Sequence, residues 1–400
     1  MTSRRNFIGK VSVGVAGTIA TMTPAARILG ANDRIRLGLI GAGARGQQIL
    51  REALACPNTE LVAVADVYRR RHEECRLIAP SARAHFDHRE MLEDPSIDAV
   101  LIATPQHLHA EHCVAALEAG RHVYLENTMA FTVDQAKRVR LAFQRAGRVL
   151  QIGHQACSSG QVEDVRQILA TGLVGRITEI HAWAYRNTPH GRPHWARPVY
   201  PDMKPENVHW SMFLGEAPQR EFDPNRFINW RLFFDYSGGS IYENMSHQAA
   251  FWYKALDLRI PRAVTTRGGI YHWRDGREAP DTLHVIMEQP EEMLFTWSSG
   301  LANGHLGSSE EALGSDGTIV RSRQVRYIPE KVNQPRTSEM LGSNRGGTHM
   351  QNFLDCIRSG KDPNCPFEIG FCTSIACRMA LESYLQGRTV IWDDRREAIV

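Results

Sequence analysis

Ile35-Arg-Leu-Gly-Leu-Ile40 runs directly into Gly41-Ala42-Gly43-Ala44-Arg45-Gly46, and this junction decides the fold of the first part of the chain. The apolar run has the length of a strand, and residues 47–55 have the pattern of a helix. A strand, a glycine-rich turn and a helix in this order predict a dinucleotide site, with all six turn residues as candidate contacts. Gly41 allows the tight turn, Gly43 lets the backbone approach a pyrophosphate, and Gly46 lets helix and strand pack closely. The phosphates would lie at the helix N-terminus, where free N–H groups favour an anion.

A second predicted strand, residues 61–65, ends in Asp66, 20 residues after Gly46. A carboxylate at this place can hydrogen-bond the adenosine ribose, which favours NAD. Arg69-Arg70-Arg71 follows closely, and a guanidinium there could instead receive the 2′-phosphate of NADP. The sequence favours NAD and leaves NADP open, with a solvated loop acid as the alternative role of Asp66.

Strands and helices continue to alternate through residue 152. We expect strands at 99–103, 122–125 and 149–152, with helices at 111–119 and 133–146. This alternation predicts a doubly wound parallel sheet, whose ligands bind beyond the carboxyl ends of its strands. Those ends carry the polar candidates Thr104, Glu126, Asn127 and Gln155.

The composition is that of an ordinary globular protein. Of 400 residues, 42% are hydrophobic and 23% are charged, which excludes a disordered or fibrous chain and suggests two domains. After residue 31 the chain has 43 basic and 44 acidic residues, so it lacks the basic surplus that a nucleic-acid partner would require. Eight scattered cysteines form no Cys-x-x-Cys pair, and we expect buried thiols.

The first 31 residues differ from the rest because they contain four basic residues and no acid. Ser3-Arg4-Arg5-Asn6-Phe7-Ile8 is a twin-arginine pattern, and the apolar run at 11–20 is too short to span a bilayer. We therefore expect an exported, periplasmic protein with no stable membrane span. The predicted division is a signal at 1–31, a nucleotide-binding domain at 32–155 and a second domain at 156–400.

Motifs spread over the chain after residue 31 resemble the glucose-fructose oxidoreductase, inositol dehydrogenase and rhizopine-catabolism (Gfo/Idh/MocA) family. They are the glycine-rich turn, Ala103-Thr104-Pro105 with His109, Gly120-Arg-His-Val-Tyr124 before Glu126, Gly172-Leu-Val-Gly175, Gly238-Gly239 before a carboxylate and His247, Gly314-Ser-Asp-Gly317, Asn352-Phe-Leu-Asp355 and Ser359-Gly360-Lys361. The resemblance implies NAD(P)-dependent oxidation or reduction of sugars and cyclitols, and it adds His109 to the cofactor candidates.

The resemblance also implies the overall fold: an N-terminal Rossmann domain and a C-terminal α+β domain with an open, mostly antiparallel sheet. Apolar and alternating runs at 177–184, 263–273, 282–289 and 292–298 agree, with a hairpin turn at Glu291-Glu292. A homo-oligomer is a further expectation from the resemblance alone.

One position departs from the family pattern. The family usually has Glu-Lys-Pro after the fifth strand, and its lysine helps to move the proton of the substrate hydroxyl. This chain has Glu126-Asn127-Thr128, and an asparagine cannot act as a general acid or base near pH 7. Glycosidases of the same superfamily also lack this lysine.

Glu243 and His247 are the remaining candidates for proton chemistry. Their i,i+4 spacing on a helix predicts that both side chains share one face, where the carboxylate could orient the imidazole. The family usually has aspartate at the first position, and a satisfied core histidine is the alternative role of His247. Tyr185, at the end of a predicted strand, is a candidate second acid near the substrate.

Aromatic and histidine clusters carry weaker signals. The aromatic residues concentrated in 183–253 could stack on a sugar ring, although most are expected to fill the core. His107, His109 and His112, like His190 and His194, lack the helical pair plus third ligand of a zinc hydrolase, so no metal is predicted.

Three functions remain open. The first is an exported sugar oxidoreductase that holds its cofactor tightly, since free NAD is not expected outside the cytoplasm. The second is an NAD-dependent glycoside hydrolase, which oxidises a ring carbon transiently, eliminates, adds water and returns the hydride without net redox change. The third is a non-catalytic sugar or nucleotide sensor. The two enzymatic functions imply a small carbohydrate as substrate.

Overall fold

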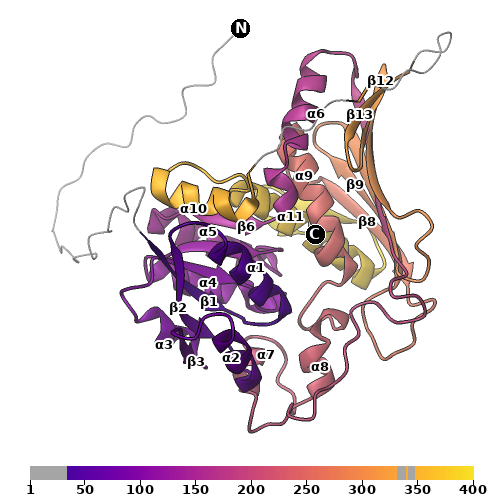
Figure 1. Ribbon diagram of the computed structural model, residues 1–400. Helices are drawn as coiled ribbons and strands as arrows, with labels where there is room; N and C mark the ends of the chain where they lie inside the picture. The colour runs from indigo at the N-terminus through magenta and orange to yellow at the C-terminus, as the bar shows by residue number, and fades with distance from the viewer. Residues whose placement is uncertain (1–33, 331–338, 341–346) are drawn as a thin grey trace.

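The structure, a computed structural model, describes residues 34–330, 339–340 and 347–400 (Figure 1). The predicted export signal and its arginines lie outside the described residues. Within the described part of the chain, no helix is both long enough and apolar enough to cross a bilayer. The eight cysteines are free thiols, and all but Cys372 are buried.

A six-stranded parallel sheet with the order β3-β2-β1-β4-β5-β6 forms the first half of the chain, as predicted. Its strands are β1 (Ile35–Ile40), β2 (Thr59–Ala65), β3 (Arg83–His85), β4 (Ala99–Ile102), β5 (His122–Glu126) and β6 (Leu150–Gly153). Its helices are α1 (Ala44–Leu54), α2 (Arg69–Arg76), α3 (His88–Leu92), α4 (His109–Glu118) and α5 (Val133–Ala146), with one 3-10 turn η1 (Gln106–Leu108). Short β3, α2 and α3 have no counterpart in the sequence prediction.

Local signals fix several of these elements. Every residue of β4 is buried and apolar, as expected for a central parallel strand. Helix α5 begins at a capping box in which Thr132 and Gln135 satisfy each other's backbone N–H groups, and it ends at Gly147 with a positive φ of 58°. These signals explain why the predicted bounds of α5 and the structure agree at both ends.

The second half is built on a ten-stranded, mostly antiparallel sheet of order β14-β13-β12-β11-β7-β10-β9-β8-β15-β16, which confirms the predicted fold class. Among the described strands of this sheet, β7 and β10 pair in parallel and the other pairs are antiparallel. The strands are β7 (Ile177–Tyr185), β8 (Ala263–Gly269), β9 (Thr282–Gln289), β10 (Met293–Gly300), β11 (Ser308–Gly314), β12 (Gly317–Arg321), β13 (Val325–Pro329), β14 (Glu339–Met340), β15 (Val390–Asp393) and β16 (Ala398–Ile399). Strand β8 ends four residues before the predicted Trp273, because Tyr271, His272 and Trp273 donate their backbone N–H groups to Asp281 instead.

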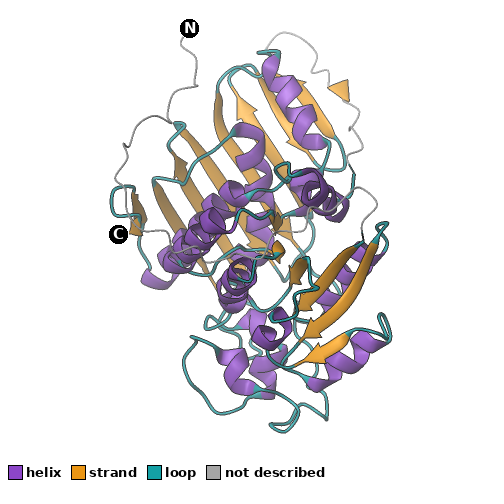
Figure 2. Cartoon of the chain, turned by 90° about the vertical axis from the view of Figure 1, so that its left-hand side faces the viewer, coloured by secondary structure: helices purple, strands orange, loops and turns teal. Residues whose placement is uncertain are grey.

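Helices cover one face of this sheet, and α9 and α11 lie between the sheet and the first half (Figures 1 and 2). The helical segments are η2 (Gln155–Ser158), α6 (Gln161–Ala170), α7 (Trp210–Leu214), α8 (Pro224–Ile228), η3 (Trp230–Leu232), the π-helical turn η4 (Ile241–Met245), α9 (Ser246–Leu256), α10 (His349–Ser359) and α11 (Phe367–Gln386). The predicted hairpin between β9 and β10 is present, with Glu292 at a φ of 60°.

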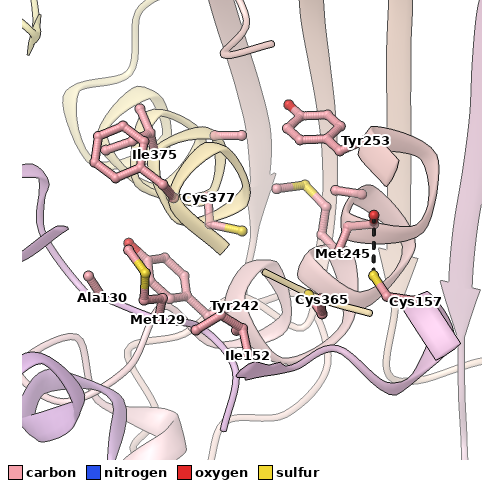
Figure 3. Packing of buried hydrophobic residues seen from close by; sticks show 14 of the residues in the cluster. Met129, Ala130, Ile152, Cys157, Tyr242, Met245, Tyr253, Cys365, Ile375 and Cys377 are labelled. Carbon is pink, nitrogen blue, oxygen red and sulfur yellow. Dashed lines mark hydrogen bonds between the residues drawn. The ribbon is translucent and has the colours of Figure 1, made fainter. Parts of the chain in front are cut away.

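One apolar core joins the two halves. It includes Ile152 of β6, Tyr242 and Met245 of η4, and Cys377 of α11 (Figure 3). Helix α10 packs instead into the core of the first half, where its Phe353 and Leu354 lie with strands β1 and β2. The linear boundary at residue 155 stays a prediction. The shared core fixes η4 and α9, which carry Glu243 and His247, against the parallel sheet.

Candidate active site

The glycine-rich turn has the geometry that the three glycines predict. Gly41 has a φ of +84°, and a Cβ there would lie 2.8 Å from the backbone of Ala103. A Cβ on Gly46 would lie 1.9 Å from the carbonyl oxygen of Gly41, so this helix can pack so closely only with glycine. A Cβ on Gly43 would meet nothing within 4 Å. The open space at Gly43 and the absence of a side-chain cap on α1 leave backbone N–H groups for a phosphate.

Asp66 follows β2 and faces this turn. Its Oδ2 accepts a hydrogen bond of 2.7 Å from Ala42 N, and its Oδ1 accepts one of 2.9 Å from Tyr68 N. Burial raises the pKa of Asp66, against the lowering effect of these amides and of Arg71. Each carboxylate oxygen keeps a further lone pair for a ribose hydroxyl. Arg71, the competing NADP contact, is paired with Glu74 at 2.6 Å.

A cleft of about 610 Å³ extends along the carboxyl ends of the strands. The predicted cofactor residues that line it are Gly41, Gly43, Ala44, Arg45, Asp66 and Thr104. Ala42 and Gly46 belong to the same turn but are buried beneath it. The cleft therefore has the residues that an NAD molecule needs at its phosphates and adenosine ribose.

A second pocket of about 420 Å³ adjoins the cleft. It brings together the remaining cofactor candidates and two catalytic candidates: His109, Glu126, Asn127, Gln155, Glu243 and His247. Both cavities share the lining residues Arg45, Gln48, Ala103, Thr104, Trp230 and Arg231. A single crevice thus leads from Asp66 to His247.

Glu126 connects the pocket to the glycine-rich turn. Its Oε1 accepts hydrogen bonds from Arg45 at 2.8 Å, Gln155 at 3.3 Å and Tyr124 at 3.4 Å. Burial raises the pKa of Glu126, while the Arg45 guanidinium opposes that shift. The role of Glu126 in this geometry is to hold Arg45 and Gln155 at the junction of the two cavities.

Asn127 occupies the position at which the family pattern has lysine. Its amide nitrogen donates to the carbonyl oxygen of Tyr242 and to Ser246 Oγ, each at 3.1 Å. The side chain therefore ties the end of β5 to η4 and α9. Its amide does not supply a titratable group.

The expected pairing of Glu243 with His247 is not what the structure shows. Glu243 accepts hydrogen bonds from Gln106 at 2.8 Å and from Arg231 at 3.0 Å. Glu243 lies in the wider π-helical turn and His247 in α9, so the helical spacing on which the prediction depended is interrupted. The carboxylate is held by a guanidinium instead of the imidazole.

His247 is therefore surrounded by basic groups. Burial and, to a smaller extent, the positive charges of Arg45, Arg186 and His349 together lower the pKa of His247 to about 4. The ring of His154 lies 5.4 Å away, edge to face. Its imidazole is neutral at pH 7 and can accept a proton, although the resulting cation would gain no help from Glu243.

Tyr185 is placed differently from the prediction. Its ring packs over Gly300 at the end of β10, where a Cβ would come within 2.8 Å of the ring. Tyr185 lines neither of the two cavities. The end of β7 is where the sequence placed Tyr185, and its ring covers Gly300 of the neighbouring strand β10.

The predicted histidine clusters have structural partners. His109 lies between the carbonyl oxygens of Thr128 and Thr104, at 2.6 and 2.8 Å, and His107 donates to that of Phe213 at 2.7 Å. His112 contacts Thr104 Oγ1 at 3.1 Å. Over the described residues, no group of three His, Cys, Asp or Glu side chains is arranged to hold a metal ion.

Sequence reasoning missed Trp230 and Arg231 as site residues. Arg231 pairs with Glu243, and its guanidinium lies 4.1 Å from the centroid of the Trp230 ring. Trp230 was one of many aromatic residues, and Arg231 belongs to no motif. Only the folded path of residues 186–240 brings them to the crevice.

The first half of the chain matches a known protein family. Residues 35–154 match the family described as "Oxidoreductase family, NAD-binding Rossmann fold", GFO_IDH_MocA. The chain is similar to 1-carboxy-3-chloro-3,4-dihydroxycyclohexa-1,5-diene dehydrogenase of Comamonas testosteroni, with 30% identity over 38% of each chain. It is also similar to inositol 2-dehydrogenase of Paracoccus denitrificans, with 29% identity over 52% of this chain and 57% of that one. The chain thus spans less than two thirds of these relatives.

Solved structures show the same fold over a longer stretch. Levoglucosan dehydrogenase in complex with NADH and levoglucosan superposes with a TM-score of 0.70. The superposition covers 90% of this chain and 99% of that chain, at 17% sequence identity. Both halves of the chain, and not only residues 35–154, therefore have the architecture of that structure.

Proposed function

We propose, from the premise that residues 35–154 form an NAD-binding Rossmann domain of the Gfo/Idh/MocA oxidoreductases, that this protein oxidises or reduces a sugar or sugar derivative at a ring carbon. The observation that carries the proposal is the single crevice that leads from the glycine-rich turn and Asp66 to His247. A nicotinamide dinucleotide bound there would supply the hydride acceptor. Asp66 favours NAD, since its carboxylate suits a ribose hydroxyl. Arg71, which could receive the 2′-phosphate of NADP, is paired with Glu74.

The residues of the second pocket suit a hydroxyl-rich ring. Glu126, Gln155, Arg231 and Glu243 present donors and acceptors, and Trp230 offers an apolar face. The names of two relatives, inositol 2-dehydrogenase and a dihydroxycyclohexadiene dehydrogenase, also describe hydroxylated rings. In this proposal the neutral His247 accepts the proton of the substrate hydroxyl, and the Arg231–Glu243 pair orients the ring.

Asn127 favours a second candidate function, an NAD-dependent glycoside hydrolase. Its amide is bonded to Tyr242 and Ser246, so the pocket has no ammonium group at the place where a dehydrogenase of this family usually has one. A hydrolase would leave the cofactor unchanged after each turnover, which also suits a protein outside the cytoplasm.

Assays on one preparation of the purified protein test both candidate functions. The protein is isolated without added nucleotide and denatured, and the supernatant is assayed for NAD and NADP. The native protein is then given free sugars and nitrophenyl glycosides while absorbance is followed at the nicotinamide and nitrophenol bands. Net nicotinamide reduction with a free sugar supports the oxidoreductase. Nitrophenol release without net reduction supports the hydrolase, and neither signal in a protein that binds NAD supports a sensor.

We also propose that the protein is exported through the twin-arginine segment and that it is a homo-oligomer. The support for export is the order Arg4-Arg5-Asn6-Phe7 before an apolar run. Replacement of both arginines by lysine should retain the protein in the cytoplasm, which cell fractionation measures. Light scattering on the purified protein measures the oligomeric state.

A further inference from the structure

Residues 186–240 form a segment, here termed the clasp, that leaves the ten-stranded sheet after β7 and crosses to the parallel sheet before returning at η4. Its residue Val208 forms a β-bridge with Tyr68, immediately before α2. His209 donates its backbone N–H to the carbonyl oxygen of Val67 at 2.8 Å. Figure 1 shows the clasp helix α7 at the same end of the molecule as α2. The second half thus contacts the first half at the adenosine end of the cleft as well as at the catalytic candidates.

Side chains anchor the clasp away from the cleft. Asp202 accepts hydrogen bonds from Tyr68 Oη at 2.6 Å and from Arg70 Nε at 2.9 Å. At a second point, Arg138 of α5 makes two hydrogen bonds of 2.8 Å with Glu216. These anchors join residues of the clasp to two different helices of the parallel domain. The clasp is therefore attached to the parallel domain at two separate points.

The clasp supplies one wall of the cleft. Met212, Phe213, Ile228, Trp230 and Arg231 line the same cavity as the glycine-rich turn. Phe213 is buried and packs edge-on to Tyr236 with ring centroids 5.0 Å apart, so this wall has a core of its own. A ligand in the cleft has the strand ends on one side and the clasp on the other.

Arginines of the cleft differ in their partners. Four of the five that line it are paired with a carboxylate within 3.0 Å: Arg45 with Glu126, Arg71 with Glu74, Arg89 with Asp87 and Arg231 with Glu243. The fifth, Arg197, is exposed and its guanidinium has no hydrogen bond or ion pair with a described residue.

Arg197 lines the cleft together with Arg71 and Arg231. Its pKa is lowered by partial burial and by the positive charges of Arg231 and Arg71. Arg231 belongs to the end that contains His247, and Arg71 to the end that contains Asp66. A guanidinium between two like charges and without a carboxylate is stabilised by an anion.

We propose that the clasp encloses the dinucleotide and that Arg197 contacts its pyrophosphate from the side opposite the glycine-rich turn. The inference rests on the proposed function, because it requires a dinucleotide in the cleft. The pyrophosphate is held by the N-terminus of α1 on one side and by a guanidinium of the other half of the chain on the other. Since the clasp is anchored at Asp202 and Glu216, the nucleotide leaves only when the clasp detaches, and it stays bound from one turnover to the next.

The test measures release of NADH from the full-length protein. The loaded protein is mixed with excess NAD, and the decay of bound NADH fluorescence gives the dissociation rate. Arg197→Met should raise the Kd for NADH by about 10- to 100-fold, the loss of one charge-assisted contact. Arg197→Lys should recover part of this loss, and adenosine, which has no phosphate, should bind both variants as it binds the wild type.

The anchor is tested separately. Asp202→Asn does not alter the cleft and should raise the dissociation rate about tenfold. Arg176→Met breaks the exposed Arg176–Glu292 pair on the distant sheet and should leave the rate unchanged. Thermal unfolding of every variant identifies those that lose their fold.

The outcomes separate the two proposals. A wild type that binds no dinucleotide overturns the proposed function and this inference with it. A wild type that binds NADH, with an unchanged Kd and dissociation rate in Arg197→Met and Asp202→Asn, overturns only this inference. Equal loss of NADH and adenosine binding in a folded Arg197→Met overturns the assignment of Arg197 to the pyrophosphate.

Discussion

The glycine-rich turn and the clasp form opposite walls of one cleft, yet the sequence specifies them in different ways. The turn is completed within a single βαβ unit, where Ala42 and the carboxylate of Asp66 are 24 residues apart in the chain. The clasp and the adjoining η4 depend on contacts between distant residues: Tyr68 and Asp202 of the clasp are 134 apart, and Gln106 and Glu243 of η4 are 137 apart. A local motif predicts its own geometry, whereas the catalytic end of the crevice depends on how two halves of the chain meet. A substitution at one end of the crevice therefore leaves the other end as a reference.

The largest effect is expected at the catalytic end of the crevice, at His247 of α9. His247→Ala removes the imidazole that lines the second pocket, and kcat should fall by about 10²- to 10⁴-fold, the usual contribution of a general base. The nucleotide should stay bound, because none of the contacts of the glycine-rich turn involves His247. Steady-state kinetics and nucleotide content measure the two effects.

The exposed His284 on β9 provides the matched control for this substitution. His284→Ala should keep full activity. If His247→Ala keeps more than about a tenth of wild-type activity, the proton acceptor is a different group, and the assignment of the catalytic end is wrong.

The next largest effect separates two glycines of the turn. Gly46→Ala places a Cβ 1.9 Å from the carbonyl oxygen of Gly41, so α1 must move, and stability should fall by about 1–3 kcal/mol or more. Gly43→Ala meets no atom within 4 Å, so the unfolding midpoint should be unchanged. Its methyl group would occupy the space left for a pyrophosphate, and the Kd for NAD should rise about tenfold.

Thermal unfolding and a nucleotide titration of both variants test this pair. The comparison fails if Gly43→Ala is destabilised as strongly as Gly46→Ala. It also fails if Gly43→Ala binds NAD with unchanged affinity, because the phosphates would then lie elsewhere in the cleft.

The same contrast explains what could be predicted from the sequence. The parallel sheet, the turn and Asp66 were accessible because each depends on neighbours in the chain: strand length, glycine spacing and the alternation of strands with helices. The second sheet was recognisable from alternating runs in β9 and β10, together with the family resemblance. The order of its ten strands could not be predicted, because β7 pairs with β10 and β11, which are far from it in the sequence.

The site residues follow the same division. Glu126, Asn127 and Gln155 could be named because they follow strands of the parallel sheet. The partner of Glu243 could not be inferred, because helical spacing favoured His247, four residues away. In the structure, Glu243 pairs with Arg231 of η3 at 3.0 Å. This pairing requires the folded clasp, which carries Arg231, and the π-helical turn, which alters the helix register at Glu243. No local pattern contains that information.

A smaller effect is expected at Asn127, where the two sides meet. Asn127→Lys supplies an ammonium group with three donors, enough to retain the contacts with Tyr242 and Ser246 while it offers a proton site. For an oxidoreductase, net oxidation of a free sugar should rise several-fold, measured at the nicotinamide band.

Asn127→Met, of similar length and without charge, is the control and should show no gain. Equal rates in the two variants would show that the missing lysine does not limit hydride transfer. A gain in nitrophenol release alone would favour the hydrolase.

The smallest effect is expected in the pH dependence of kcat/KM. This dependence shows whether His247 lies among arginines or is paired with a carboxylate. His247 must be neutral to accept a proton, and its pKa is about 4, so it stays neutral at every pH above 5. As the pH falls through the pKa the base is protonated and activity is lost, but that loss lies below the tested range. Between pH 5 and pH 8, kcat/KM should therefore change by less than about twofold on account of His247.

Glu126→Gln is the control for this profile, because burial raises the pKa of the Glu126 carboxyl in the same pocket. A rise of activity with pH that is present in the wild type and absent in this variant belongs to Glu126. A rise centred between pH 6 and 7 that persists in Glu126→Gln belongs to His247, and it would mean that a carboxylate supports the imidazole during turnover. In that case Glu243 exchanges Arg231 for His247 when substrate binds, and the catalytic end is closer to the helical pairing that the sequence predicts than to the arrangement in this structure.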